Sequence, residues 1–193
     1  MLVIACGRTE KAPDSTQKHN HDVTDSVARN TVPASIQEIK ALFATTINQL
    51  SMGKLDSTVL TYDCAGERSG TITYFTESGN LRLIRHRYSE YSHYTAEDEY
   101  FVSDEKLYFA FLHGVSWSFV SDGATKDDHL EQRIYLANNK PIQCLEKKYA
   151  VQTGQTKTPN AVNRRVDCKP VAPLLKKFEQ LLNFRKVKRD CLS

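Results

Sequence analysis

The sequence has no apolar run that approaches the 18 or so residues needed to cross a membrane as a helix. It has only eight glycines and no glycine-rich phosphate loop, which argues against a dinucleotide-binding fold. The G-x-S-x-G and H-E-x-x-H motifs are both missing, so no catalytic residue can be assigned from a local motif. No C-x-x-C or H-x-x-C spacing indicates a zinc site. We therefore expect no cofactor and no metal.

The formal net charge of +3 is small, and its distribution is more informative than its size. Residues 176–193 carry six basic and two acidic side chains, so the rest of the chain is close to neutral. Basic side chains suit the C-terminal end of a helix dipole. We interpret this segment as the solvated face of a final helix and expect no nucleic-acid partner.

The first residues carry a pattern typical of protein export. Val3-Ile4-Ala5-Cys6 is a branched apolar residue, a tolerant position, a small residue and a cysteine. It resembles the lipobox of bacterial lipoproteins, which implies that Cys6 receives a diacylglycerol and becomes the new N-terminus. Only five residues precede Cys6 and none is basic, whereas a signal peptide has a basic region and an apolar segment of about 7–15 residues. We expect residues 1–6 to be the remnant of a longer signal, and the resemblance implies no fold.

The same resemblance implies a location. A lipoprotein is held in a membrane of the cell envelope through its modified cysteine, here Cys6, and faces the periplasm or the exterior. Gly7, rather than an aspartate, follows that cysteine. This resembles lipoproteins sorted to the outer membrane of Gram-negative bacteria, so we expect the outer membrane rather than the inner one.

Residues 7–33 form a polar segment with almost no large apolar side chains. Such a stretch cannot bury enough apolar surface to offset the entropy lost on ordering. We interpret it as a disordered tether, which as a flexible coil would span roughly 30 Å. Residues 34–193 are then expected to form a single folded domain.

Four cysteines remain besides Cys6, and an even number in an exported protein predicts two disulfides. A helix of about 15 residues, roughly 22 Å long, is expected between Cys168 and Cys191. Because a disulfide needs Cα atoms within about 7 Å, these two are not expected to pair. Two pairings remain: Cys144–Cys168 with Cys64–Cys191, or Cys64–Cys168 with Cys144–Cys191. We favour the first because Cys144 and Cys168 are closer in sequence.

Helical patterns lie at both ends of the expected domain. Ser35 and Glu38 have the spacing of a capping box, and an apolar stripe follows until Met52-Gly53. A second stripe begins after Pro170, with Pro173 suited to the first turn. Its apolar residues are Val171, Leu174, Leu175, Phe178, Leu181 and Leu182.

Short β-rich runs separated by turn residues fill the chain between the two helices. The turns include 77–80 and Asn138-Asn139, whose tolerance of positive φ suits a tight hairpin. No segment between the runs could form a crossover helix, so the strands are expected to be antiparallel. The expected strands are 59–63, 70–76, 81–88, 99–102, 107–112, 115–120, 129–137 and 141–149.

These elements predict an α+β fold. It consists of an antiparallel meander sheet of about eight strands, twisted or curved into a half-barrel. The simplest packing places the N-terminal and the C-terminal helix on one face of this sheet. The other face would then be solvated, closed into a half-barrel or used for binding.

The aromatic residues are concentrated, because 13 of the 18 lie between Tyr62 and Phe119. The simplest interpretation is that their rings fill the core. A second interpretation places several tyrosines on the opposite face or its loops, since tyrosines with a solvated hydroxyl are common on recognition surfaces. These are Tyr88, Tyr91, Tyr94, Tyr100 and Tyr108.

The most polar expected strand is 81–88. Alternation places Arg82, His86 and Tyr88 on one side and Arg85 and Arg87 on the other. Several acids follow nearby, so the simplest interpretation is a set of cross-strand ion pairs on a solvated face. The alternative is an anion-binding patch of arginine and tyrosine. The candidate ligand-binding residues are therefore Arg82, His86, Tyr88, Tyr91, Tyr94 and Tyr108.

Three functions remain open. The favoured one is a non-catalytic, lipid-anchored envelope protein that binds a protein or a small ligand through its sheet face or loops. The second is an envelope hydrolase with a histidine, such as His86 or His113, beside a carboxylate in a concave site. The third is a structural or inhibitory component of an envelope complex, with a flat exposed aromatic patch.

Overall fold

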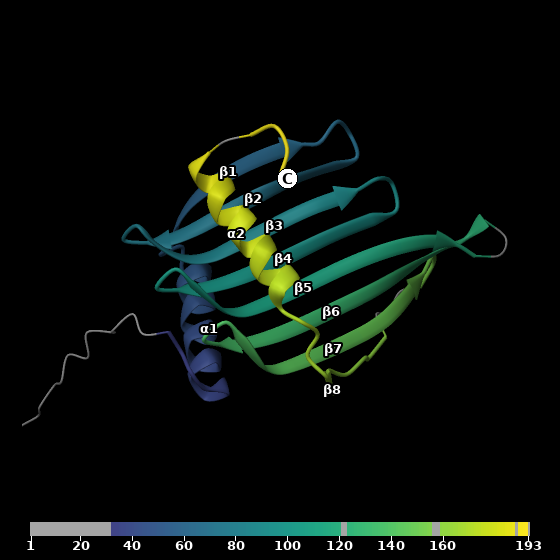
Figure 1. Ribbon diagram of the computed structural model, residues 1–193. Coiled ribbons are helices and arrows are strands. Elements are labelled where there is room, and N and C mark those ends of the chain that lie inside the picture. Colours follow the sequence, from purple (N-terminus) through teal and green to yellow (C-terminus); the bar gives the residue numbers. More distant parts are fainter. Residues whose placement is uncertain (1–31, 121–122, 156–158, 188, 193) are drawn as a thin grey trace, which may run out of the picture.

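The computed structural model describes residues 32–120, 123–155, 159–187 and 189–192 (Figure 1). Cys6 and the expected tether up to residue 31 lie outside these residues. Within them, neither helix combines the length and the apolarity that a membrane span requires. The elements in order are α1 (Ile36–Ser51), β1 (Asp56–Asp63), β2 (Arg68–Glu77), β3 (Asn80–Glu90), β4 (Tyr94–Ser103), β5 (Lys106–Phe119), β6 (Thr125–Ala137), β7 (Lys140–Gln152), β8 (Arg164–Val166) and α2 (Ala172–Lys186).

The strands form one open sheet in sequence order, β1 to β8, and every neighbouring pair is antiparallel. The predicted α+β meander is therefore confirmed. The hairpin at Asn138-Asn139 is confirmed too, with φ angles of 51° and 60°. A further tight turn at Asp104-Glu105, with φ angles of 49° and 57°, joins β4 to β5. Such two-residue turns match the twist of the strands that they connect.

The placement of both helices on one face is wrong, because α1 and α2 cover opposite faces of the sheet (Figure 1). Consecutive strand residues separate accordingly: Leu83 packs in the cluster under α1, and Ile84 packs in the cluster under α2. The strands carry apolar residues on both parities, as in Tyr74-Phe75 and Tyr100-Phe101. A sheet that is apolar on both faces needs a cover on each.

Helix α1 begins with the predicted capping box. The Ser35 hydroxyl accepts a hydrogen bond from the Glu38 amide at 3.3 Å, and the Glu38 carboxylate accepts one from the Ser35 amide at 3.1 Å. The helix packs through Ile39, which is fully buried, and Phe43, whose ring centroid lies 4.9 Å from that of Phe101. The face of the sheet that α1 covers also carries the ion pairs predicted for Arg85 and Arg87, which contact acids on β4.

Helix α2 crosses the other face diagonally (Figure 1), and both of its ends are tied to the sheet by disulfides. Cys144 of β7 pairs with Cys168, just before the helix, and Cys64, which follows β1, pairs with Cys191, just after it. The favoured pairing is therefore confirmed. Phe178, Leu181 and Phe184 are buried against the strands.

The predicted strands differ from the observed ones in two ways: one strand was divided in two, and one strand was not predicted. The runs 107–112 and 115–120 belong to one strand, β5, because His113 and Gly114 stay in register with both neighbouring strands. The short strand β8 was not foreseen, and it pairs with β7 beside the Cys144–Cys168 disulfide. Its three residues, all exposed, carry no periodic pattern from which a strand could have been predicted.

Candidate ligand-binding site

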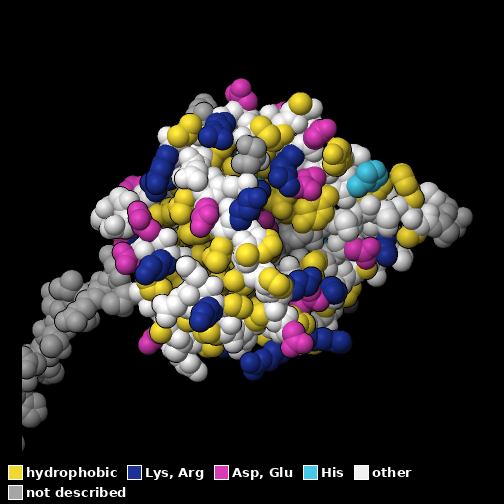
Figure 2. All heavy atoms as spheres, in the orientation of Figure 1, with side chains coloured by type: hydrophobic (Ala, Val, Ile, Leu, Met, Phe, Trp, Pro, Cys, Tyr) yellow, Lys and Arg dark blue, Asp and Glu magenta, His cyan; other side chains and the backbone are white. Residues whose placement is uncertain are grey.

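A cavity of about 780 Å³ lies between α2 and the face of the sheet that this helix crosses. Strands β2 to β8 and the segment that leads into α2 contribute its walls. Figure 2 shows this face of the molecule hollowed beside the helix, with hydrophobic side chains and Lys or Arg side chains around the hollow. Cavities of roughly 300–1,000 Å³ are typical of small-molecule sites.

One part of the cavity is apolar. Leu112 of β5 and Ile134 of β6 point towards α2, because alternation along these strands places them on that face. Val171 and Leu174 face them from the start of the helix. These half-buried side chains leave a surface that an apolar ligand can cover.

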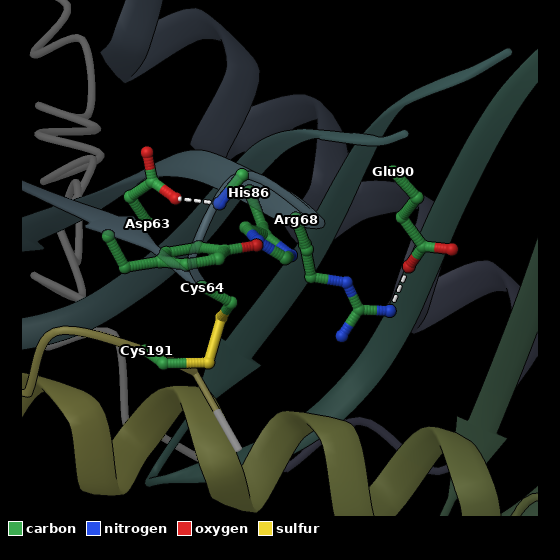
Figure 3. The surroundings of a disulfide bond; sticks show 8 residues. Asp63, Cys64, Arg68, His86, Glu90 and Cys191 are labelled. Atoms are coloured by element: carbon green, nitrogen blue, oxygen red, sulfur yellow. Dashed lines mark hydrogen bonds and ion pairs between the residues drawn. A yellow bond between two sulfur atoms is a disulfide. The ribbon is translucent and has the colours of Figure 1, made fainter. Parts of the chain in front are cut away.

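Among the polar side chains that line the other part of the cavity, four from different elements lie beside one another. Arg68 begins β2, Tyr88 lies in β3, Asp98 lies in β4 and Lys177 lies one turn after Leu174 in α2. The Arg68 guanidinium is bound to Glu90 on the neighbouring strand (Figure 3). Lys177 makes no ion pair with any described residue.

Asp98 is 7% exposed and lies at the bottom of this polar part. Burial raises the pKa of its carboxyl to about 6, while Lys177 and the hydroxyls of Tyr100 and Tyr88 act in the opposite direction. The Tyr100 hydroxyl donates to the carboxylate at 3.4 Å. Asp98 can therefore exchange a proton close to neutral pH.

Lys177 also has a shifted pKa. Burial and the neighbouring Arg68 lower the pKa of its ammonium to about 8, and Asp98 acts against them. The ammonium still carries its charge at pH 7, because that pH lies below its pKa. Lys177 is thus a positive charge inside the cavity that no carboxylate of a described residue contacts.

His86 lies behind this group and is fully buried. Its ring stacks on Tyr88 with centroids 4.4 Å apart, and its Nε2 lies 2.9 Å from the Tyr62 hydroxyl. Its Nδ1 has no hydrogen-bond partner among the described residues. Burial, followed by Lys177 and Arg68, lowers the pKa of His86 to about 3, so the ring is neutral. Figure 3 shows His86 beside Arg68, near the disulfide that closes this end.

Two glycines make room for tyrosines on this face. A Cβ atom at Gly70 would lie 2.8 Å from the Tyr62 hydroxyl oxygen and 2.7 Å from the carbonyl oxygen of Arg87. A Cβ atom at Gly114 would lie 2.5 Å from the Tyr94 hydroxyl oxygen. Both tyrosines can lie flat along the strands only because these side chains are missing.

A second hollow of about 220 Å³ continues along the sheet from the cavity. The two share Tyr88, Asp98, Leu112 and Gln132, and the second one adds Tyr94. A ligand in the cavity could therefore extend towards the far ends of β4 and β5.

The structure brings together only some of the predicted ligand-binding residues. Tyr88 and Tyr94 line the two hollows, and His86 supports Tyr88 from behind. Tyr108 is fully buried under α1 on the opposite face, so its assignment to a recognition surface is wrong. Tyr91 is exposed in the turn between β3 and β4. Neither Tyr91 nor Arg82 lines the cavity.

Arg82 lies away from the cavity, although alternation predicted that it shares a side with His86 and Tyr88. It lines a separate hollow with Leu182 and Arg185, near the C-terminal end of α2. A β-bulge beside it shifts the register between β2 and β3, so Phe75 pairs with Leu83 and Thr76 pairs with Leu81. The Arg82 guanidinium forms an ion pair with Glu77 at 3.0 Å.

Three residues of the cavity were not predicted from the sequence: Arg68, Asp98 and Lys177. For Lys177 a signal was present, because it lies three residues after Leu174 and four before Leu181, on the apolar stripe of its helix. A charged residue on such a stripe points at the core or at a cavity. Asp98 also shares strand parity with Tyr100 and Tyr94, but only the register with β3 places it next to Tyr88.

The arrangement offers no catalytic pair at His86. Its position in β3 is paired with that of Asp98 in β4, as a hydrolase site would require. However, Nε2 contacts Tyr62, Nδ1 has no partner in the part of the chain that the structure describes, and the ring is fully buried, so no substrate can reach it. His113 lies on the opposite face, where its Nε2 is 3.2 Å from Nδ1 of His129. Among the described residues, no group of three or more His, Cys, Asp or Glu side chains could hold a metal ion.

An exposed aromatic group lies at the far end of the sheet. Trp117 packs beside His93, with centroids 4.3 Å apart, and against Phe119 at 5.1 Å. Phe119 is 71% exposed. A structural component was expected to have a flat exposed aromatic patch, and that expectation stays a prediction.

No protein-family model matches the chain, and no curated protein or solved structure matches it either. The function must therefore be argued from the geometry of the cavity itself.

Proposed function

We propose that the protein binds a small, largely apolar molecule in the cavity beneath α2, without acting on it chemically. The observation that carries this proposal is the cavity of about 780 Å³, in which apolar walls surround a few convergent polar groups. Binding sites for small molecules have this composition. The enclosed His86 supports a binding role over hydrolysis, because a hydrolase needs a base that its substrate can reach.

The two disulfides support the same proposal. They hold the residues on either side of α2 against the sheet, so the helix that covers the cavity is fixed at both ends. A preformed cavity loses little conformational entropy when it takes up a ligand.

The proposed location is outside the cytoplasm. Two disulfides are compatible with an extracytoplasmic protein, since such compartments are oxidising. The lipobox-like Val3-Ile4-Ala5-Cys6 and the polar segment behind it support a lipid anchor at Cys6, and Gly7 supports the outer membrane. In this proposal the tether holds a ligand-binding domain clear of the bilayer.

Metabolic labelling of a bacterium that expresses the protein, with a radioactive fatty acid, tests the anchor. We expect label on the protein and none on the Cys6→Ser variant. A protein without label, or a variant that keeps it, would refute the anchor and leave the binding proposal untouched.

A cavity-filling substitution tests the binding proposal. N-phenyl-1-naphthylamine, a neutral fluorescent apolar probe, should bind with enhanced emission. Leu112→Trp should weaken this binding at least tenfold, because the indole would occupy the apolar part of the cavity. Val115→Trp, on the same strand but on the opposite face, is the matched control and should bind like the wild type. No binding by the wild type, or equal binding by both variants, would overturn the proposal.

A further inference from the structure

Two positive charges converge on one tyrosine ring in the polar part of the cavity. The guanidinium carbon of Arg68 lies 5.4 Å from the centroid of the Tyr88 ring, and the Lys177 nitrogen lies 5.5 Å from it. His86 stacks on the same ring and holds it in place. Cations at such distances are attracted by the ring, but they also repel each other.

The cations that line the cavity outnumber the carboxylates. They are Arg68, Lys148, Lys169 and Lys177, against Asp98, Glu146 and Asp167. Arg68 forms an ion pair with Glu90, which lies outside the cavity lining, and Lys148 forms one with Glu146. Among the described residues, Asp98 is the acid that acts on the charge of Lys177, and the two side chains do not form an ion pair. Asp98 is itself buried and receives the Tyr100 hydroxyl. An ammonium that pairs with no described carboxylate, beside a carboxyl able to take up a proton, favours an anion.

The apolar wall begins immediately beside these charges. Leu174 lies one helical turn before Lys177. Leu112 lies next to Asp98, because the two residues are paired across β4 and β5 and line both hollows. From there the wall continues through Ile134 on the next strand. Because neighbouring strands are about 4.8 Å apart, the distance from β3 to β6 is roughly 14 Å. That length suits an extended aliphatic chain.

We propose that the ligand is a single-chain amphiphile that carries one anionic group, a carboxylate or a phosphate. Its head lies between Lys177, Arg68 and the Tyr88 hydroxyl, and its tail lies along Leu112, Ile134 and Leu174. This inference rests on the proposed binding function and names the class of molecule that the cavity takes. Asp98 takes up a proton from solvent when the anion binds, and its carboxyl then donates a hydrogen bond to the head group.

Displacement of N-phenyl-1-naphthylamine from the full domain tests this inference. The competitors are dodecanoate, dodecyl phosphate, dodecanol, dodecylamine, and acetate or inorganic phosphate as heads without a tail. We expect at least one of the two anionic amphiphiles to displace the probe at concentrations at least tenfold lower than the alcohol or the amine. Whichever anion binds more tightly identifies the source as a free fatty acid or a phosphorylated lipid. Acetate and inorganic phosphate should not displace the probe.

Substitution of Lys177 isolates the contribution of the charge. Lys177→Gln should weaken binding of the preferred anion about tenfold and leave the affinity for dodecanol unchanged, and Lys177→Arg should retain anion binding. Lys176→Gln is the matched control, because this neighbour is exposed and does not line the cavity.

The two proposals fail in different ways. If the probe binds but anions compete no better than dodecanol, or if Lys177→Gln has no effect, the anionic head is refuted and the apolar cavity stands. If neither the probe nor any amphiphile binds to the wild type, the binding function is refuted.

Discussion

Asp98 and His86 occupy paired positions on neighbouring strands. Burial raises the pKa of the Asp98 carboxyl and lowers the pKa of the His86 imidazole. The carboxyl is raised to about 6 and the imidazole is lowered to about 3. Both shifts favour the neutral form, so an uncharged pair is the most stable state of this buried group. The two residues therefore affect the dependence of stability on pH in opposite ways.

For Asp98, the folded pKa lies above the unfolded one. Its stabilising contribution is complete below about pH 4 and is lost as the pH rises through about 6. For His86, the folded pKa lies below the unfolded one, so its contribution is complete above about pH 6.5 and is lost as the pH falls towards 3. Between pH 4 and 6 the stabilising contribution of Asp98 falls with rising pH, while that of His86 increases. This pair should therefore change the melting temperature of the wild type little in that range.

The Asp98→Asn substitution should remove one of the two slopes. The variant should be more stable than the wild type at pH 8, by up to roughly 3 kcal/mol, because no buried carboxylate has to ionise. Between pH 4 and 6 its stability should rise steadily with pH, since the His86 term is no longer opposed. Urea unfolding at several pH values measures both effects. A variant whose pH profile parallels that of the wild type would contradict this account.

At the scale of elements, α1 is held by its cap and by one apolar side. The capping box satisfies two backbone amides that the helix cannot satisfy itself. The sequence predicted this helix start correctly, because Ser35 and Glu38 are local to it. The same reasoning placed α2 correctly after Pro170, and Pro173 lies in its first turn as expected.

Removal of the cap should destabilise the domain by a modest amount. Ser35→Ala should lower the free energy of unfolding by about 1 kcal/mol, because the Glu38 amide loses its acceptor. Thr45→Ala is the control in the same helix, since its hydroxyl only donates to the carbonyl of Ala41 and satisfies no free amide. Chemical denaturation compares the two variants, and equal losses would show that the cap contributes nothing specific.

Strand boundaries were predicted less well than the helices. His113-Gly114 was expected to separate two strands, whereas β5 runs through it. Gly114 is required there by the approach of the Tyr94 side chain from the neighbouring strand, not by a turn. A glycine that marks a close contact and a glycine that marks a turn are the same letter in a sequence, and only the partner strand distinguishes them.

At the scale of the whole molecule, the disulfides make α2 part of the sheet. The Cys64–Cys191 bridge spans 127 residues of sequence and joins the two ends of the fold. The Cys144–Cys168 bridge spans 24 residues and forms part of the cavity wall, because Cys144 lines the cavity. One bridge is therefore expected to matter most for stability and the other for ligand binding.

Removal of each bridge should separate these two effects. By loop-closure entropy, the Cys64→Ala/Cys191→Ala variant should lose about 1.5 kcal/mol more stability than the Cys144→Ala/Cys168→Ala variant. Affinity for the apolar probe should show the opposite order, because the second variant releases the segment that leads into α2. Denaturation and probe titration measure the two orders. The same order in both assays would contradict the division of roles.

The sequence by itself determined the two helices, the antiparallel character of the sheet and the exclusion of a Cys168–Cys191 disulfide. It left two disulfide pairings open and favoured the correct one. These features depend on periodicity, caps, turn residues and the length of a helix, all of which are local. The sequence also contained the reason for a cover on each face, in adjacent apolar residues such as Tyr74-Phe75, but both helices were amphipathic and either could have covered either face.

Only the tertiary structure decided where α1 and α2 lie and what they enclose. The cavity needs Arg68, Tyr88, Asp98 and Lys177 from four elements, and a slip of one residue in the register of β3 or β4 would turn Tyr88 or Asp98 to the opposite face. Register and helix placement depend on contacts between distant segments, so the site follows from the packing of the whole chain.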